Sequence, residues 1–261
     1  MLLRADGDAV VVIGQPAHAW VSGQIARSWG NERFGSVESR EAVCLAAEQH
    51  DVGMAGWDLE PTLNTTTGRP HGFTELPLET HLALWTEGPR TVMTQSPHAA
   101  LLVSMHGAGL YERRDLSKAE PSDAAAIRSF LADQRSFQEH LAEALRADPA
   151  SASAVEPDRI ARHSRLVWTW DALSLALLLD WAPYRTEDVP TAGDPVALDL
   201  TTLDPAAARF SLDPWPFATE TVTVSCPGRR LEGRFVDEDE MRRALELAPR
   251  RTLAFELVPA P

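Results

Sequence analysis

Positive charge and cysteine are both scarce in this sequence. Its 24 lysine and arginine residues stand against 38 aspartate and glutamate residues, so the formal net charge is −14. Nucleic acids and anionic membranes attract basic patches, and this balance therefore argues against either as the main partner. The two cysteines, Cys44 and Cys226, lie far apart and are expected to be buried free thiols of a reducing compartment.

Long apolar runs are missing as well. The longest, Ala172 to Leu179, is interrupted by Ser174 and is too short to span a bilayer. Residues 1–6 lack the apolar region of a signal peptide. We therefore expect a cytoplasmic protein without a membrane partner.

Several common catalytic motifs are absent. Gly14, Gly23 and Gly30 have the spacing of neither a P-loop nor a dinucleotide-binding loop. Ser104 lacks the flanking glycines of a hydrolase nucleophile elbow. The aspartates near the C-terminus are spaced like strand and turn residues rather than like a calcium loop: Asp194, Asp199, Asp204 and Asp213.

The residue pattern divides the chain into three regions. Its 261 residues, 44% of them hydrophobic, suit one large domain or one domain with an appendage. Residues 1–13 are typical of short strands, 14–183 of a helical body, and 184–261 of a β-rich part packed on that body. The N-terminal strands are expected to join the β-rich part, which makes the predicted fold mostly α within an α+β arrangement.

Apolar spacing and capping signals define the individual elements. We expect helices over 15–29, 37–50, 79–85, from 96 onward, and over 122–147, 157–181 and 239–247. Strands are expected at 9–13, 196–200, 208–212, 221–225, 231–235 and 253–257. Glycine and proline punctuate 52–79, which predicts a loop there.

Two candidate sites lie early in the helical region. His18 shares a face with Val21 and Ile25, a pattern more typical of a hydrogen-bonded core histidine than of a ligand. His50 and Asp51 end the second helix. Adjacent helical side chains point about 100° apart, so this pair can reach one metal ion only near a helix end.

Later helices contribute more polar groups. His98 and His106 border one face of the helix that starts after Ser96, and His81 lies on the preceding helix. Asp171 shares a face with apolar neighbours, and a buried carboxylate is costly unless it is paired or bound to a cation. A salt bridge, for example to Arg162, and a metal ion both explain it.

The order of these groups is more informative than any single one. A histidine, a His-Asp pair, further histidines and a late aspartate form the pattern H…HD…H…D. Imidazoles and carboxylates that point inward from helices suit Zn²⁺, Fe and Mn²⁺. The pattern resembles the HD-domain superfamily of helical metal-dependent phosphohydrolases, whose four-residue signature matches His18, His50, Asp51 and Asp171.

This resemblance implies an HD-like helical bundle over 14–183 and one or two divalent transition-metal ions, Fe, Mn or Zn. His81 and His106 would complete a second metal site in which Asp51 bridges the ions, with His71 and His98 as substitutes. Asp51 and His106 would be the catalytic residues. A minority of the superfamily uses the same ligands in di-iron oxygenases.

A closer resemblance is to the bacterial family known as domain of unknown function 3891, which brings no established activity. The matching stretches are spread over nearly the whole chain: Gln15–His18, His50–Gly53, Gly68–Phe73, Leu102–His106, Trp170–Leu175 and Pro214–Phe217. Met54 stands where that family is expected to have tryptophan, which shifts the first-loop aromatic to Trp57.

The leading hypothesis is a metal-dependent hydrolase that acts on a small anionic phosphate ester, with Arg69 or Arg165 steadying the anion. A di-iron oxygenase with the same ligands is one alternative. The other is a binding or structural protein whose histidines are satisfied core groups and whose segment 52–79 is an interaction surface. The metal content of the purified protein separates the two enzymes from this third possibility.

Overall fold

Strands from both ends of the chain form one seven-stranded sheet. The computed structural model describes residues 1–261, and the strand order is β1-β2-β8-β9-β7-β6-β5. Neighbouring strands are antiparallel except β7 and β9, which are parallel. The strands are β1 (Leu2–Asp6), β2 (Ala9–Ile13), β5 (Tyr184–Val189), β6 (Val196–Asp204), β7 (Arg209–Asp213), β8 (Val222–Leu231) and β9 (Arg250–Pro259).

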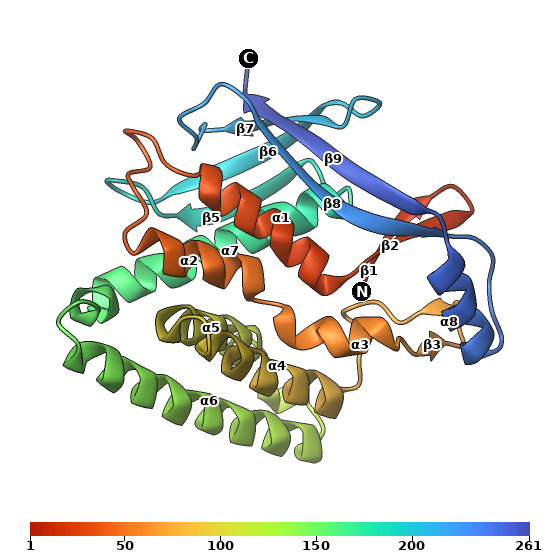
Figure 1. Cartoon of the computed structure of the whole chain (residues 1–261), viewed down its shortest axis with the longest axis horizontal. Coiled ribbons are helices and arrows are strands. Elements are labelled where there is room, and N and C mark those ends of the chain that lie inside the picture. The colour runs from red at the N-terminus through yellow and green to blue at the C-terminus, as the bar shows by residue number, and fades with distance from the viewer.

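Two helices cover one face of this sheet (Figure 1). Helix α1 (Gln15–Ser28) packs on β8, helix α7 (Pro157–Leu178) packs on β5, and the two helices contact each other. Val222, Val224 and Cys226 alternate along β8 as buried residues, as expected for a strand with one covered face. Sheet and helices together confirm the α+β fold expected from the sequence.

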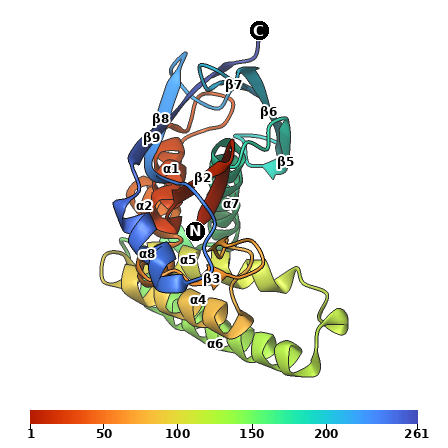
Figure 2. The ribbon, with the colours of Figure 1, turned by 90° about the vertical axis from the view of Figure 1, so that its right-hand side faces the viewer.

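The other long helices lie beyond this layer. Helix α2 (Arg40–Gln49) contacts α1, and helix α5 (Pro97–Glu112) contacts both α2 and α7. Helices α4 (Leu78–Met93) and α6 (Pro121–Ala147) pack on α5, and α6 runs along the edge farthest from the sheet (Figure 2). The polar residues on α1, α2, α5 and α7 are therefore brought together inside the helical layers.

The segment 52–79 is more ordered than the predicted loop. It contains a 3-10 turn (Val52–Met54), helix α3 (Ala55–Leu59) and a ribbon of β3 (Leu63–Asn64) with β4 (Arg69–Pro70). Helix α8 (Glu238–Leu247) is tied to this ribbon because the backbone N–H of Leu63 donates to Glu238, 2.8 Å away. Further 3-10 turns lie at Leu116–Lys118 and Ala152–Val155.

One strand prediction was wrong, and one strand was missed. Strand β5 was not foreseen, and the strand expected over 231–235 does not form, because Leu231 is the last residue of β8. Gly233 follows with a φ of 82°, which is outside the conformations of a strand. The apolar residues near 231 therefore end one long strand instead of starting another.

Two apolar clusters flank the polar residues of the interior. The larger lies between the sheet and the helices and includes the fully buried Trp170 and both free cysteines. The smaller joins α4, α5 and α6: Met54, Leu82, Trp85, Tyr111, Ile127 and Phe130. No helix combines the length and the apolar character needed to span a bilayer.

Candidate metal centre

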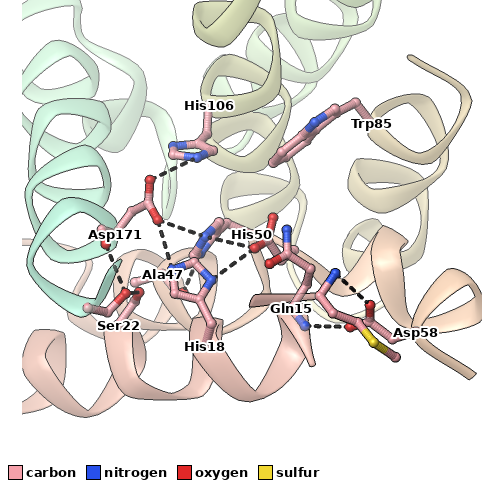
Figure 3. A network of polar contacts seen from close by, with 12 residues as sticks. Gln15, His18, Ser22, Ala47, His50, Asp58, Trp85, His106 and Asp171 are labelled. Carbon is pink, nitrogen blue, oxygen red and sulfur yellow. Dashed lines mark hydrogen bonds and ion pairs between the residues drawn. The ribbon is translucent and has the colours of Figure 1, made fainter. Parts of the chain in front are cut away.

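His18 lies at the base of the candidate site. Pro16 occupies the first turn of α1, where its missing N–H costs nothing, and His18 follows in the buried part of that turn. Its Nδ1 lies 3.0 Å from Asp51 Oδ2, and its Nε2 lies 3.0 Å from Asp171 Oδ1 (Figure 3). One imidazole therefore lies between two buried carboxylates.

The His50–Asp51 pair sits at a helix end, as the spacing argument requires. Helix α2 ends at Gln49, and Asp51 leaves the helical conformation with φ −100° and ψ 13°. His50 donates from Nδ1 to the carbonyl of Ala47, 2.8 Å away, so its Nε2 faces the site. That Nε2 lies 3.5 Å from Asp51 Oδ2 and 3.4 Å from Asp171 Oδ1.

Gly53 permits the close packing behind this pair. A Cβ at Gly53 would lie 2.3 Å from the carbonyl oxygen of Leu84 and 3.0 Å from the backbone nitrogen of Gly88. The backbone of α4 therefore presses directly on the turn that follows Asp51. A side chain here would push α4 and the His50–Asp51 turn apart.

His106 closes the site from above. Its Nε2 lies 3.6 Å from Asp171 Oδ2, while its buried Nδ1 has no hydrogen-bond partner. Trp168 and Trp85 flank the ring, with centroids 4.3 Å and 5.6 Å away. Gly107 makes room for Trp85, because a Cβ there would lie 2.5 Å from the indole. The aromatic walls hold the His106 ring in position.

The partners of the buried Asp171 carboxylate are histidines and not an arginine. Arg162, the alternative partner, donates instead to the backbone carbonyls of Thr191 and Phe34. The Asp171 backbone carbonyl accepts a hydrogen bond from Ser174, whose hydroxyl in turn accepts one from Ser22 of α1. This bridge ties α1 to α7 at the level of the site.

The electrostatics of the site reflect burial opposed by mutual attraction. Burial lowers the pKa of His18, but hydrogen bonds and charges of Asp171 and Asp51 outweigh it and raise the pKa to about 9. Burial would raise the pKa of both carboxyls, yet the neighbouring imidazoles keep both values below the ordinary one. Burial lowers the pKa of His106 to about 4, so that imidazole is neutral at pH 7.

The donor set fits a metal ion. Two overlapping groups, His18-His50-Asp51 and His50-His106-Asp171, each have one ligand atom per residue, all within 4.8 Å of one another. Metal–ligand bonds of about 2.1 Å place adjacent ligand atoms roughly 3.0–3.4 Å apart, close to the N–O distances found here. The neutral His106 ring directs its Nε2 at Asp171, and His50 is oriented through its second nitrogen as metal-binding histidines are.

A cavity of about 280 Å³ opens onto these ligands. Its other lining residues are apolar or neutral apart from Arg114: Gln15, Phe73, Thr74, Leu76, Leu78, His81, Trp85, Leu110, Tyr111 and Leu175. A larger cavity of about 680 Å³ lies beside α8 and contains none of the clustered histidines. Chemistry, and not size, therefore identifies the smaller cavity as the candidate site.

The other predicted residues lie elsewhere or make other contacts. His81 lines the cavity, but both of its ring nitrogens have protein partners, Tyr111 and Trp85. His71 is hydrogen-bonded to Thr62, and His98 packs against His163 away from the ligands.

Neither of the arginines proposed for the substrate lines the cavity. Arg69 donates to the carbonyl of Asp8, and Arg165 donates to backbone carbonyls of β5. Sequence reasoning missed Gln15, Tyr111 and Arg114 instead. Gln15 begins the stretch Gln15–His18, and its position three residues before His18 was the one sequence feature that could have placed it at the site.

The fold and the cluster define an α+β protein with a buried histidine–aspartate centre able to hold a metal ion. The chain belongs to the family described as protein of unknown function (DUF3891), whose sequence model matches residues 1–233. All five clustered residues lie within that match. No curated protein and no solved structure matches the chain.

Proposed function

We propose that the protein is a metal-dependent hydrolase of a phosphate ester. One or two divalent ions, Fe, Mn or Zn, would be held by His18, His50, Asp51, His106 and Asp171. The observation that supports this proposal is the meeting of three buried imidazoles and two buried carboxylates at the inner end of one cavity. Burying this much polar and charged surface is costly unless a cation balances it.

A bound divalent ion supplies Lewis-acid activation of water near neutral pH. The chain supplies orientation and exclusion of bulk solvent. The hydrogen bond from His50 to Ala47 fixes the ring that faces both carboxylates. The apolar wall of Leu110 and Leu175 limits the water that reaches the ligands.

Asp51 and His106 are assigned the catalytic roles in this proposal. Asp51 Oδ2 lies between the imidazoles of His18 and His50, where it can orient an attacking water and accept its proton. His106 is neutral at pH 7 because of its lowered pKa. Its ring can therefore bind a metal ion, or accept a proton, without first losing a proton.

Metal analysis followed by an ester panel tests the proposal. The purified protein should contain Fe, Mn or Zn, and small phosphomonoesters should be hydrolysed after loading with one of these metals. His50→Gln should reduce metal content and activity together. His71→Gln is the matched control, because His71 is bonded to Thr62 outside the cluster and should leave both unchanged.

The alternatives have their own outcomes in this experiment. Substoichiometric metal, with no stabilisation by added Mn²⁺, Fe²⁺ or Zn²⁺, would overturn the proposal and favour a binding or structural protein. Bound iron with oxygen consumption and no ester hydrolysis would favour the di-iron oxygenase.

A further inference from the structure

Trp85, His81 and Tyr111 form a hydrogen-bonded chain along the wall of the cavity. Trp85 Nε1 donates to His81 Nε2, 3.0 Å away, one helical turn along α4. His81 Nδ1 lies 2.5 Å from the hydroxyl of Tyr111 on α5. All three residues line the same cavity as the His/Asp cluster.

The direction of these bonds follows from the donors. An indole N–H can only donate, so His81 Nε2 must accept and carries no proton. A neutral imidazole keeps one proton, which must then be on Nδ1 and must be donated to Tyr111 Oη. Burial lowers the pKa of His81 to about 4, in agreement with a neutral ring.

The hydroxyl proton of Tyr111 consequently has no acceptor within the protein. Its oxygen accepts from His81, and the hydroxyl has no other protein partner. Burial raises the pKa of Tyr111 to about 12, so the proton remains on the phenol across the physiological range. A buried donor without an acceptor is costly, and here the space available to it is the cavity.

Two further polar residues line the same cavity. The guanidinium of the exposed Arg114 stacks on the Tyr111 ring, 4.5 Å from its centroid, and Arg114 lines the cavity. Gln15 is 6% exposed, and its Oε1 is buried without a partner. Arg114 therefore supplies positive charge, and Gln15 a buried amide, at the wall of the same cavity.

We propose that Tyr111 and Arg114 form the recognition site for the anionic oxygens of the substrate, and that His81 is a positioning residue that aims the Tyr111 hydroxyl. The ligand class is a small phosphomonoester with a largely apolar body. This inference rests on the proposed function for the choice of phosphate.

The size and lining of the cavity define this ligand class. About 280 Å³ lies just below the roughly 300–1,000 Å³ typical of small-molecule pockets. Phe73, Leu78 and Leu110 provide an apolar wall, and Arg114 is the single arginine in the lining. A bulky polyphosphate would lack both room and counter-charges, whereas one phosphate on a small apolar group satisfies the available donors.

The same geometry argues against His81 as a metal ligand. As a metal ligand, His81 would have to release Trp85 or Tyr111 and leave a buried donor unpaired. His18, His50, Asp51 and Asp171 instead point their ring and carboxylate atoms at one another. Metal content and anion affinity should therefore respond to different residues.

Fluorine NMR with inorganic phosphate as the probe tests this proposal directly. The chain has two tyrosines, so protein labelled with 3-fluorotyrosine gives two signals, which Tyr184→Phe and Tyr111→Phe assign. Phosphate added to the metal-loaded protein should shift the Tyr111 signal to saturation. Tyr111→Phe should weaken phosphate binding about tenfold or more, as measured by calorimetry, and should leave the metal content unchanged.

Tyr184→Phe is the matched control, because Tyr184 lies on β5 outside the cavity lining and its loss should leave phosphate affinity unchanged. His81→Phe should weaken phosphate binding as Tyr111→Phe does. His81→Asn should restore most of it, because its amide places a donor near the position of Nδ1. Both His81 variants should retain the metal.

Three results would overturn the inference: no phosphate-dependent shift of the Tyr111 signal, full phosphate affinity in Tyr111→Phe, or loss of metal in His81→Phe. The proposed function fails in a different way, through absent metal or absent ester hydrolysis. Phosphate bound through Tyr111 in a protein that holds no metal would support the recognition site and refute the hydrolase.

Discussion

Replacing Asp171 by asparagine is the most direct perturbation of the centre. Asparagine keeps nearly the same shape but removes the charge that lies 3.0 Å from His18, 3.4 Å from His50 and 3.6 Å from His106. The residue is 7% exposed, so solvent cannot replace the lost interaction. Two quantities should change: the stability of the metal-free protein and its affinity for metal.

The size of the stability change follows from His18. Asp171 and Asp51 together raise its pKa from 6.5 to about 9. At about 1.36 kcal/mol per pKa unit, this corresponds to about 3.4 kcal/mol. If the two carboxylates contribute equally, Asp171→Asn should lower the free energy of unfolding of the metal-free protein by roughly 1.5–2 kcal/mol.

The pH dependence has a definite sign. The folded-state pKa of His18 lies above the unfolded value, so this stabilisation is complete below about pH 6.5 and disappears as the pH rises through about 9. Urea unfolding of chelator-treated protein should therefore show a wild-type advantage at pH 6 that shrinks by pH 9.

Metal retention is the second readout. Loss of groups that merely orient ligands commonly costs 10–100-fold in metal affinity, so loss of a charged ligand should cost at least about that much. Asp158→Asn is the control, since Asp158 is an exposed aspartate on the same helix. Equal metal content in Asp171→Asn and wild type, or a stability difference independent of pH, would refute the reasoning.

Three further predictions concern the frame around the centre. Gly53→Ala places a Cβ against the Leu84 carbonyl and should destabilise the protein by about 1–3 kcal/mol in urea unfolding, with weaker metal binding. Gly107→Ala should displace Trp85 and change its fluorescence while the helices persist by circular dichroism. Burial lowers the pKa of His163 to about 4, so protonation of the unfolded chain should cost about 2 kcal/mol of stability at pH 5 relative to pH 7; His163→Phe should flatten that slope.

Periodicity predicted most helices because their buried stripes recur every three to four residues. Periodicity failed where tertiary packing keeps a proline inside a helix. The helix expected over 79–85 continues to Met93 through Pro89, because Gly88 packs on Gly53 and holds the chain in its helical course. A contact between segments this far apart in sequence leaves no local signal at Pro89.

The clustered histidines and aspartates were predictable for a different reason. A charged or polar side chain on an apolar helix face can be recognised in the sequence, and its burial costs free energy unless it is paired. Asp171 was the clearest example. Tyr111 and Arg114 carried no such signal, since a tyrosine is ordinary in a core and an arginine is ordinary at a helix end. Their proposed role depends on the direction of a hydrogen bond from His81 and on the stacking of Arg114 on the Tyr111 ring.

The charges of the centre connect its stability to its proposed chemistry. Asp51 and Asp171 are buried, and Arg162, the arginine considered as a partner for Asp171, donates instead to backbone carbonyls. Positive charge must therefore come from a protonated His18 or His50, whose pKa values are both raised, or from a metal ion. Metal ligands must be deprotonated, so protons and metal compete for the same imidazoles and carboxylates. The neutral His81–Tyr111 pair takes no part in that competition, which leaves the proposed substrate recognition independent of the charge state of the ligands.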